Sequence, residues 1–294
     1  MLRGGYVIRV GTRGSQLAMI QTQRVVEKLK GHIPGLEVEI KVIKTTGDLF
    51  LKPRTAGRFV DEINRALING DIDVGVHSLK DLPTGLHPKI MLACVPERLA
   101  PNDVLVSHDG STLHELPGGS IVGTSSPRRK AEILHIRPDL LTADMRGNVP
   151  TRLKDVESRK YDAAVLARAG LERLGLTEKI AQEFNLEEVV PAPGQGALGV
   201  VCRRGDEGIL DKLLLINDGD AWREVICERT FAGALGLGCG VPIGAVARTA
   251  GEEIELIAVV HSNGRRTLRL RGRDPVELGR RAARILSKGG KSRV

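Results

Sequence analysis

The stretch IVGTSSPRRKAEILH, residues 121–135, decides the fold class. Its first three residues are apolar or small, a pattern typical of a short buried strand. Ser126 is a favourable N-cap and Pro127 suits the first helical turn, which together predict a helix over residues 127–135. A strand that leads directly into a helix is the unit from which α/β sheets are built.

The same strand–helix alternation extends along the chain in both directions. Apolar runs predict strands, and apolar residues three or four apart predict helices between them. The predicted strands lie at 7–10, 38–43, 72–76, 90–95, 104–106, 121–122, 140–145 and 163–166, and the predicted helices lie at 15–29, 59–67, 127–135 and 151–159. The alternation restarts after Pro101, so we expect two similar α/β domains, each with a largely parallel sheet.

A third region follows near residue 220. The segment 191–194 reads as a hinge, and 199–202 reads as a strand that returns to the first domain. Beyond residue 220 we expect a helix, followed by a glycine-rich loop at 236–240. Two antiparallel strands at 254–260 and 267–271 and a closing helix at 275–286 complete the region. The expected domains are 1–98 with 195–217, then 102–191, then a smaller α+β domain at 220–294.

The composition points to an anionic partner. The chain has 294 residues, 41% hydrophobic and 2% aromatic, with a formal net charge of +8. Nucleic acid, acidic lipid and a polycarboxylate all suit a basic protein. Few aromatic residues argue against a nucleic-acid stacking platform, and no apolar run reaches the ~18 residues of a membrane span. Arginine forks suit carboxylates, which favours a small anionic substrate.

Four cysteines occur, at positions 94, 202, 227 and 239. Their spacing contains no paired metal knuckle, so no metal is expected. Residues 1–6 lack the apolar core of a signal peptide. We therefore expect a reduced, cytoplasmic setting.

Two adjacent arginines break a local rule. Arg128 and Arg129 fall in the first turn of the predicted helix, where the helix dipole disfavours each cation by roughly 0.3–1 kcal/mol. Bound carboxylates would relieve this conflict and would also use the free N–H groups of the turn. Two solvated surface arginines are the alternative interpretation.

Two further loops repeat this design. Arg13 and Ser15 follow a predicted strand and open a helix, and so do Arg146 and Arg152. All three loops lie at carboxyl ends of strands, where α/β sheets bind ligands. Three such loops in two adjoining domains predict a cleft lined with positive charge.

Asp81 and Cys239 are the two other side chains with chemical potential. Asp81 lies in the segment 77–83 among cationic neighbours, which favour its ionised form, although a simple polar turn ended by Pro83 fits equally well. Cys239 lies between glycines in the segment 236–242, where a bulky group would have space. A buried structural cysteine is the alternative.

These segments together, in this order, resemble the porphobilinogen deaminase family, whose activity is also called hydroxymethylbilane synthase. The resemblance covers nearly the whole chain. It is carried by the residues around Arg13 and Ser15 and by the segments 77–83, 123–129, 146–152, 191–197 and 238–242.

The resemblance implies two α/β domains similar to solute-binding proteins that flank a cleft, followed by the smaller third domain. It also implies a dipyrromethane cofactor joined by a thioether to Cys239. The implied reaction condenses four porphobilinogen molecules with loss of four ammonia molecules, and water then releases the linear tetrapyrrole. The implied protein is a monomer that binds neither nucleic acid nor membrane.

The resemblance also assigns roles to single residues. Asp81 is the implied catalytic carboxylate. The implied contacts to substrate or growing-chain carboxylates are Arg13, Arg146, Arg152 and Arg173, with Gln21 and Gln195 as weaker candidates. The implied contacts to the cofactor are Lys80, Ser126, Arg128 and Arg129, with Ser15 and Thr124 as weaker candidates.

The chain departs from the family pattern at two places. Before Phe59 the family often has a glycine- and lysine-rich stretch, whereas this chain has Thr55-Ala56-Gly57-Arg58. The usual lysine is missing there, and Arg58, Arg54 or Lys52 are possible substitutes. Pro127 replaces an aliphatic residue, a conservative change at the start of a helix.

Two rival functions remain at this point. A solute- or effector-binding protein would share the arginine-lined cleft but would not need Cys239. A nucleic-acid-binding protein is indicated only by the isoelectric point of about 9.5. A covalent mass excess on the peptide that contains Cys239 would favour the enzyme over both.

Overall fold

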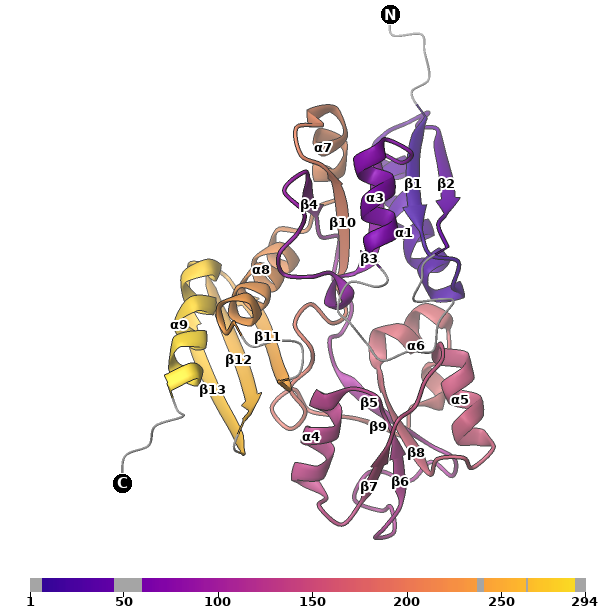
Figure 1. Cartoon of the computed structure of the whole chain (residues 1–294), viewed down its shortest axis with the longest axis vertical. Coiled ribbons are helices and arrows are strands. Elements are labelled where there is room, and N and C mark those ends of the chain that lie inside the picture. The colour runs from indigo at the N-terminus through magenta and orange to yellow at the C-terminus, as the bar shows by residue number, and fades with distance from the viewer. Residues whose placement is uncertain (1–6, 45–59, 237–240, 263, 289–294) are drawn as a thin grey trace, which may run out of the picture. The chain divides into compact units, whose positions relative to one another are not determined.

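The computed structural model describes residues 7–44, 60–236, 241–262 and 264–288 (Figure 1). These residues form two compact units. The first unit takes its residues from 1–98 and 197–222, and the second takes them from 99–196 and 223–294.

The first unit is built on a five-stranded sheet with the strand order β2-β1-β3-β10-β4. The three strands β1, β2 and β3 are parallel, whereas β10 runs antiparallel to both β3 and β4. Its elements are β1 (Ile8–Thr12), α1 (Gln16–His32), β2 (Val38–Val42), α3 (Asp61–Asn69), β3 (Val74–Ser78), the 3-10 turn η1 (Leu79–Asp81), β4 (Ile90–Cys94), β10 (Leu198–Arg203) and α7 (Glu207–Leu214).

Burial of aliphatic side chains holds this sheet to its helices. α1 contributes Val25, Val26 and Leu29, which lie on one helical face and are at most 3% exposed. They pack with residues of β1, β3, β4, β10 and α7 in a single core cluster. Removing a fully buried side chain of this size from such a core costs about 2–5 kcal/mol.

The second unit contains another five-stranded sheet, with the order β7-β6-β8-β5-β9. β6 is parallel to β7 and β8, and β5 is antiparallel to β8 and β9. Its elements are β5 (Asp103–Ser107), β6 (Ile121–Gly123), α4 (Pro127–Ile136), β7 (Leu141–Ala143), α5 (Val149–Glu157), β8 (Ala163–Ala167), α6 (Arg168–Leu174), the 3-10 turn η2 (Thr177–Lys179) and β9 (Gln182–Glu183).

Core clusters cover both faces of this second sheet. In β8, Ala163 and Val165 belong to one cluster, and Ala164 and Leu166 belong to the other. Alternate residues of a strand point to opposite faces, so β8 is buried on both sides. A near-continuous apolar run is the sequence signature of such a strand.

The same unit also holds a three-stranded antiparallel sheet, β11-β12-β13, with α8 and α9 packed beside it (Figure 1). Its elements are α8 (Gly219–Ala234), β11 (Ile243–Ala250), β12 (Glu253–His261), β13 (Arg265–Gly272) and α9 (Pro275–Lys288). The two helices approach closely at Gly279, where an added Cβ would lie 2.5 Å from the carbonyl oxygen of Cys227. Any larger residue at position 279 would push α9 away from α8.

The expected fold class is confirmed: two mixed α/β sheets are followed by a small α+β region. The strand predicted at 199–202 does return to the first sheet, as β10 between β3 and β4. The expectation of largely parallel sheets was too simple, because β10 and β5 run antiparallel to their neighbours. β11 was not predicted from its mixed sequence. The three domain boundaries and the cleft stay predictions.

Candidate functional site

Predicted site residues of the first unit gather at one edge of its sheet. β1 and β3 are adjacent and parallel, so their carboxyl ends share an edge. Arg13 and Ser15 follow β1, and Lys80 and Asp81 follow β3. The topology therefore brings two cations and a carboxylate to the edge where α/β sheets bind ligands.

The turn η1 presents Asp81 to solvent. Leu79 and Leu82 on either side are 1% and 4% exposed and anchor the turn in the core. The backbone N–H of Leu79 donates to Ala197 at 3.0 Å, and that of Leu82 donates to Leu79 at 3.0 Å. Lys80 and Asp81 lie between these anchors and are both exposed. The carboxylate of Asp81 is thus held on a fixed backbone without being buried.

The start of α1 is fixed to the end of β3. Ser15 is the N-cap of α1, and its hydroxyl accepts from the Ala18 N–H at 3.3 Å. Gln21 is buried, and its Nε2 donates to the Ser78 hydroxyl at 2.9 Å. Of these two predicted site residues, Ser15 caps a helix and Gln21 joins two elements of the edge.

The pKa of His77 depends on its burial and on the positive charge at this edge. Burial lowers the pKa of His77 to about 4, with a further contribution from the positive charge of Arg13. The imidazole is therefore neutral at pH 7, and Arg13 lies near enough to act on it. This effect of Arg13 on a residue of β3 supports the close approach of the two strand ends.

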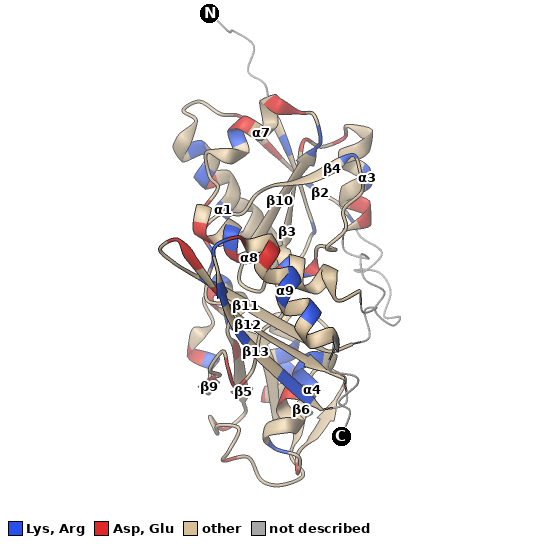
Figure 2. Ribbon diagram, turned by 90° about the vertical axis from the view of Figure 1, so that its left-hand side faces the viewer, with Lys and Arg blue, Asp and Glu red and all other residues tan. Residues whose placement is uncertain are grey.

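The remaining predicted residues collect at the carboxyl edge of the second sheet. β7, β6 and β8 are neighbouring parallel strands, so the loops after them share one edge. The predicted residues that follow these strands are Thr124, Ser126, Arg128, Arg129, Arg146, Arg152 and Arg173. Figure 2 shows the basic ribbon segments of α4 in this unit.

Ser126 and Pro127 start α4 as the sequence predicts. The Ser126 hydroxyl accepts from the backbone N–H of Arg129 at 3.4 Å, and Pro127 occupies the first turn. Thr124 is buried, and its hydroxyl accepts from the Ser126 N–H at 3.2 Å. The Thr124 and Ser126 hydroxyls therefore set the backbone that carries the two arginines.

Arg128 and Arg129 are buried and share the carboxylate of Asp103. Arg129 donates from Nε and Nη2 to Asp103 Oδ1 at 3.0 and 2.7 Å. Arg128 Nη1 lies 2.7 Å from Asp103 Oδ2 and donates to the Val190 carbonyl at 2.8 Å. The side chains of the two arginines are 6% and 8% exposed, and that of Asp103 is fully buried.

The ion pairs with Asp103 change what the helix dipole implies about Arg128 and Arg129. Two cations in the first turn need an anion, and Asp103 already provides one within the protein. Burial by itself would raise the pKa of Asp103, but the charges of Arg128 and Arg129 outweigh burial and hold that pKa well below its ordinary value. Neither arginine is a solvated surface residue, so that alternative is wrong.

The other arginines at this edge differ in how far the protein engages them. Arg146 is exposed, and no described residue pairs with its guanidinium. Arg152 donates from Nε to the Gly147 carbonyl at 2.9 Å, and Arg173 is buried and donates to the Gly196 carbonyl at 2.7 Å. Gln195 is buried as well, and its Nε2 donates to Asp103 Oδ1 at 2.9 Å.

Sequence reasoning missed the buried carboxylates Asp103 and Glu228. Asp103 follows Pro101-Asn102, and nothing local marks it, because its partners lie 25 and 26 residues away in sequence. Glu228 in α8 is fully buried and accepts from the N–H groups of Gly194 at 2.6 Å and Ala247 at 2.7 Å. For Asp103, the one available signal was the pair of cations in the first turn of a helix, which indicates that an anion is needed nearby.

Family models match almost the whole chain. The model described as "Porphobilinogen deaminase, dipyromethane cofactor binding domain" matches residues 8–211, and the one described as "Porphobilinogen deaminase, C-terminal domain" matches residues 222–288. The chain belongs to the porphobilinogen deaminase family. This confirms the resemblance that the loop motifs indicated.

Relatives of the porphobilinogen deaminase family align over nearly their full length. The chain is 45% identical to the porphobilinogen deaminase of Halalkalibacterium halodurans, with 98% of this chain and 96% of that protein covered. It is 44% identical to a probable porphobilinogen deaminase of Pyrobaculum neutrophilum, with 97% and 99% covered. For the porphobilinogen deaminase of Thermus thermophilus the identity is 47%, with 82% and 80% covered.

The similar solved structures are more distant in sequence than these relatives. The methionine-binding protein MetQ is similar with a TM-score of 0.47 and 16% identity, covering 77% of this chain and 93% of that one. The effector-binding domain of BenM with benzoate has a TM-score of 0.43 and 16% identity, covering 71% and 90%.

The described cysteines fit a thioether-bound cofactor poorly. Cys94, Cys202 and Cys227 are fully buried. Burial raises the pKa of the Cys202 thiol to about 11 and of the Cys227 thiol to about 12, and it also raises that of Cys94. The thiolate is the reactive form, so these three are poor attachment points. Cys239, like residues 52–58 discussed above, lies outside the described residues.

The cationic donors at the two edges fit the carboxylates of a dipyrromethane. Within the described part of the chain, both polar contacts of Arg128 use Nη1. Its Nε and Nη2 remain as donors for a carboxylate, which guanidinium binds in a two-pronged manner. Lys80 and Arg146 are exposed cations at the two edges.

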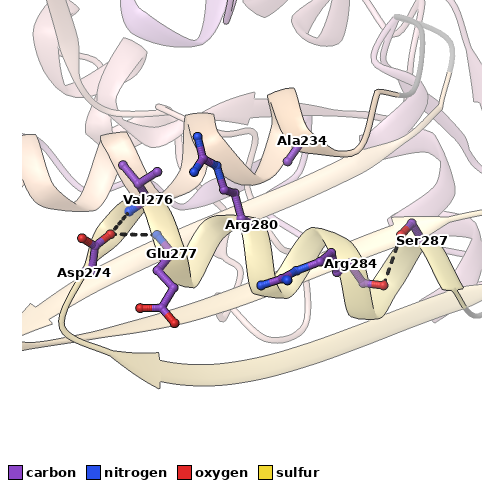
Figure 3. Close-up of a pocket in the computed structure, with 7 residues that line it drawn as sticks. All are labelled: Ala234, Asp274, Val276, Glu277, Arg280, Arg284 and Ser287. Carbon is purple, nitrogen blue, oxygen red and sulfur yellow. Dashed lines mark hydrogen bonds between the residues drawn. The ribbon is translucent and has the colours of Figure 1, made fainter.

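A cavity of about 580 Å³ lies elsewhere, between α9 and the end of α8 (Figure 3). None of the predicted site residues lines it; its walls are Ala234, Asp274, Val276, Glu277, Arg280, Arg284 and Ser287.

Over the ranges that the structure describes, no three His, Cys, Asp or Glu side chains gather as metal ligands. Every described helix is too short or too polar to cross a membrane.

Proposed function

We propose that this chain condenses four porphobilinogen molecules head-to-tail into hydroxymethylbilane, the activity of a hydroxymethylbilane synthase. In each step the bond from the aminomethyl carbon to nitrogen breaks, and nitrogen leaves as ammonia. A bond then forms from that carbon to the free α-carbon of the preceding pyrrole, which loses its proton. Release of the linear tetrapyrrole breaks the bond between the methylene of the first pyrrole joined and the cofactor carbon that carries it. Water supplies the hydroxyl group to that methylene and the proton to that carbon, so four substrates and one water yield one product and four ammonia molecules.

The proposed cofactor is a dipyrromethane joined by a thioether to Cys239. The high thiol pKa values of the buried Cys202 and Cys227 support this position by elimination. When bound, the dipyrromethane supplies the pyrrole carbon to which the first substrate is joined. Its acetate and propionate groups match the cationic and hydroxyl donors proposed to hold it, which are Lys80, Ser126, Arg128 and Arg129 with Ser15 and Thr124.

The proposed substrate contacts are Arg13, Arg146, Arg152 and Arg173, with Gln21 and Gln195. Each porphobilinogen brings two carboxylates, so a growing chain accumulates negative charge that guanidinium groups offset. The exposed Arg146 is available for direct contact. Gln21 and Gln195 are the weaker candidates, because both are buried and already engaged. Gln21 joins α1 to β3 in the first unit, and Gln195 contacts Asp103 in the second.

Asp81 is the proposed catalytic residue, and its exposure on an anchored turn is the observation that carries the proposal. Positive charge develops on the substrate pyrrole as ammonia leaves. A fixed carboxylate ~4 Å away at an effective dielectric of ~20 contributes about 4 kcal/mol of attraction. If that attraction arises mainly in the transition state, it accelerates the step by roughly three powers of ten. Asp81 can also accept the pyrrole N–H and help to move protons.

We further propose that the protein acts in the cytoplasm as a monomer, without nucleic acid or membrane as a partner. The carboxylate-matched arginines at both sheet edges support a small polycarboxylate substrate over nucleic acid.

An isosteric substitution tests the proposed reaction. We expect Asp81→Asn to retain its covalent cofactor and to lose roughly 10³-fold in turnover, because only the charge is removed. Intact mass measures the cofactor, and ammonia release measures turnover. Asp71→Asn is a matched control, since Asp71 is an exposed aspartate just before the same strand β3. Comparable turnover in Asp81→Asn and in the parent protein would refute the role, and no ammonia release by the parent would refute the function.

A further inference from the structure

The position of Asp103 follows from one reversed strand. β5 runs antiparallel to β8, so the first residue of β5 pairs with Ala167, the last residue of β8. Reversal thus places the amino end of β5 at the carboxyl edge of β6, β7 and β8. Asp103 is therefore the buried carboxylate at the edge where the proposed ligand-binding arginines emerge.

The contacts of Asp103 divide the two arginines into different roles. Arg129 uses Nε and Nη2 on Asp103 Oδ1, and its Nη1 donates to the Val165 carbonyl at 2.9 Å. All three nitrogens of Arg129 therefore have partners inside the protein. The partners of Arg128 in the described structure engage Nη1 alone, which leaves Nε and Nη2 for another acceptor.

The carboxylate itself is held firmly. Oδ1 accepts from Arg129 and also from Gln195 Nε2 at 2.9 Å, and the same nitrogen of Gln195 donates to the Pro101 carbonyl at 2.6 Å. Asp103, Arg128 and Arg129 together carry one net positive charge, since two guanidiniums face one carboxylate. A single ligand carboxylate on Arg128 would balance this group of three.

We propose that Asp103 is a positioning residue that holds Arg128 so that Nε and Nη2 receive one carboxylate of the dipyrromethane. Arg129 supports this arrangement by binding Oδ1, the other oxygen of the same carboxylate. This inference rests on the proposed function and deepens it, because it names the residue that sets the geometry of the cofactor contact. Ligand contacts of this kind depend on side chains that their own partners hold in place.

The test measures cofactor assembly rather than activity alone. The chain is purified from cells that make no porphobilinogen and is then incubated with porphobilinogen, and intact mass follows the covalent mass gain. We expect Asp103→Asn to load at least tenfold more slowly than the parent, with its melting temperature recorded beside it. Asp73→Asn is the matched control, since Asp73 is also fully buried and also shared by two arginines, Arg9 and Arg203.

Asp73 precedes β3, so it lies at the amino edge of its sheet, opposite the proposed site. We expect Asp73→Asn to lose stability, because it too leaves two cations without their carboxylate, while its folded fraction loads at the parent's rate. Slow loading in both variants would show a general effect of stability and would overturn the inference.

A double variant separates charge balance from positioning. Asp103→Asn with Arg129→Gln restores the parent's net charge, so it should regain melting temperature relative to Asp103→Asn. We expect its loading to remain at least tenfold slow, because Oδ2 no longer orients Arg128. Arg129→Gln alone is the reference for the double variant, which should load at least threefold more slowly than it, because only the double variant has also lost the Asp103 carboxylate. If Asp103→Asn does not fold, the double variant carries the comparison.

Two further results would overturn the inference: loading of Asp103→Asn at the parent's rate, or full recovery of loading in the double variant. Failure of the parent itself to gain mass would instead refute the proposed function. The two failures are therefore distinguishable in one set of measurements.

Discussion

The carboxyl edges of the two five-stranded sheets hold their carboxylates in opposite ways. At the first edge Asp81 is exposed on a turn whose flanking leucines are buried. At the second edge Asp103 is fully buried and faces two guanidiniums. Asp103 is buried and already faces two cations, so it is poorly placed to stabilise a third, whereas Asp81 is exposed. Under the proposed function, charge stabilisation falls to Asp81 at the first edge, and Asp103 supports carboxylate binding through Arg128 at the second.

Substituting the two adjacent arginines one at a time is the strongest test of this division. We expect Arg128→Leu to abolish most cofactor assembly, because it removes the donors that face the ligand. Arg129→Leu should instead lower the free energy of unfolding by about 3 kcal/mol, because it breaks a buried ion pair. Intact mass and urea unfolding measure the two effects. Full cofactor occupancy in Arg128→Leu would contradict the cofactor-binding role of Arg128. Equal effects of the two substitutions would show that the two arginines do not have different roles.

A smaller effect sharpens the description of the first edge. The pKa of His77 is about 4 in the folded chain against 6.5 ordinarily, first because of burial and then because of Arg13. The unfolded chain thus binds more protons between about pH 4 and 6.5, so His77 makes stability rise with pH across this window. We expect Arg13→Gln to raise this pKa while burial keeps it below 6.5. An NMR titration of the His77 ring measures the change, and an unmoved pKa would place Arg13 away from β3.

Local sequence patterns predicted most of the fold. The start of α4 followed from Ser126 and Pro127, whose cap and ring act within a few residues. β8 followed from its apolar run, since burial on both faces leaves that signature. Strand direction did not follow, because antiparallel insertion of β10 and β5 depends on where distant segments pair. β11 was missed, since Arg248 and Thr249 interrupt its apolar character.

The candidate site could likewise be predicted only in part, because local sequence does not specify which distant segments pair. The loops that carry Arg13, Asp81 and Arg128 were visible as residues that follow strands, and the topology collects them at two edges. The burial of Arg128 was not visible, because its partner Asp103 lies on a strand whose direction local sequence does not specify. A cation that conflicts with its helix dipole indicated that an anion is needed there, and could not say whether protein or ligand provides it.

Stepwise addition of pyrroles to a cofactor on Cys239 is tested most directly by the intact mass of the chain during turnover with limiting porphobilinogen. We predict a covalent excess that increases in equal steps, one for each pyrrole added, and that maps to the peptide containing Cys239. In Asp81→Asn the initial excess should be present and the steps should nearly stop. An unchanged mass in the parent chain, or stepwise additions on a peptide without Cys239, would contradict the account.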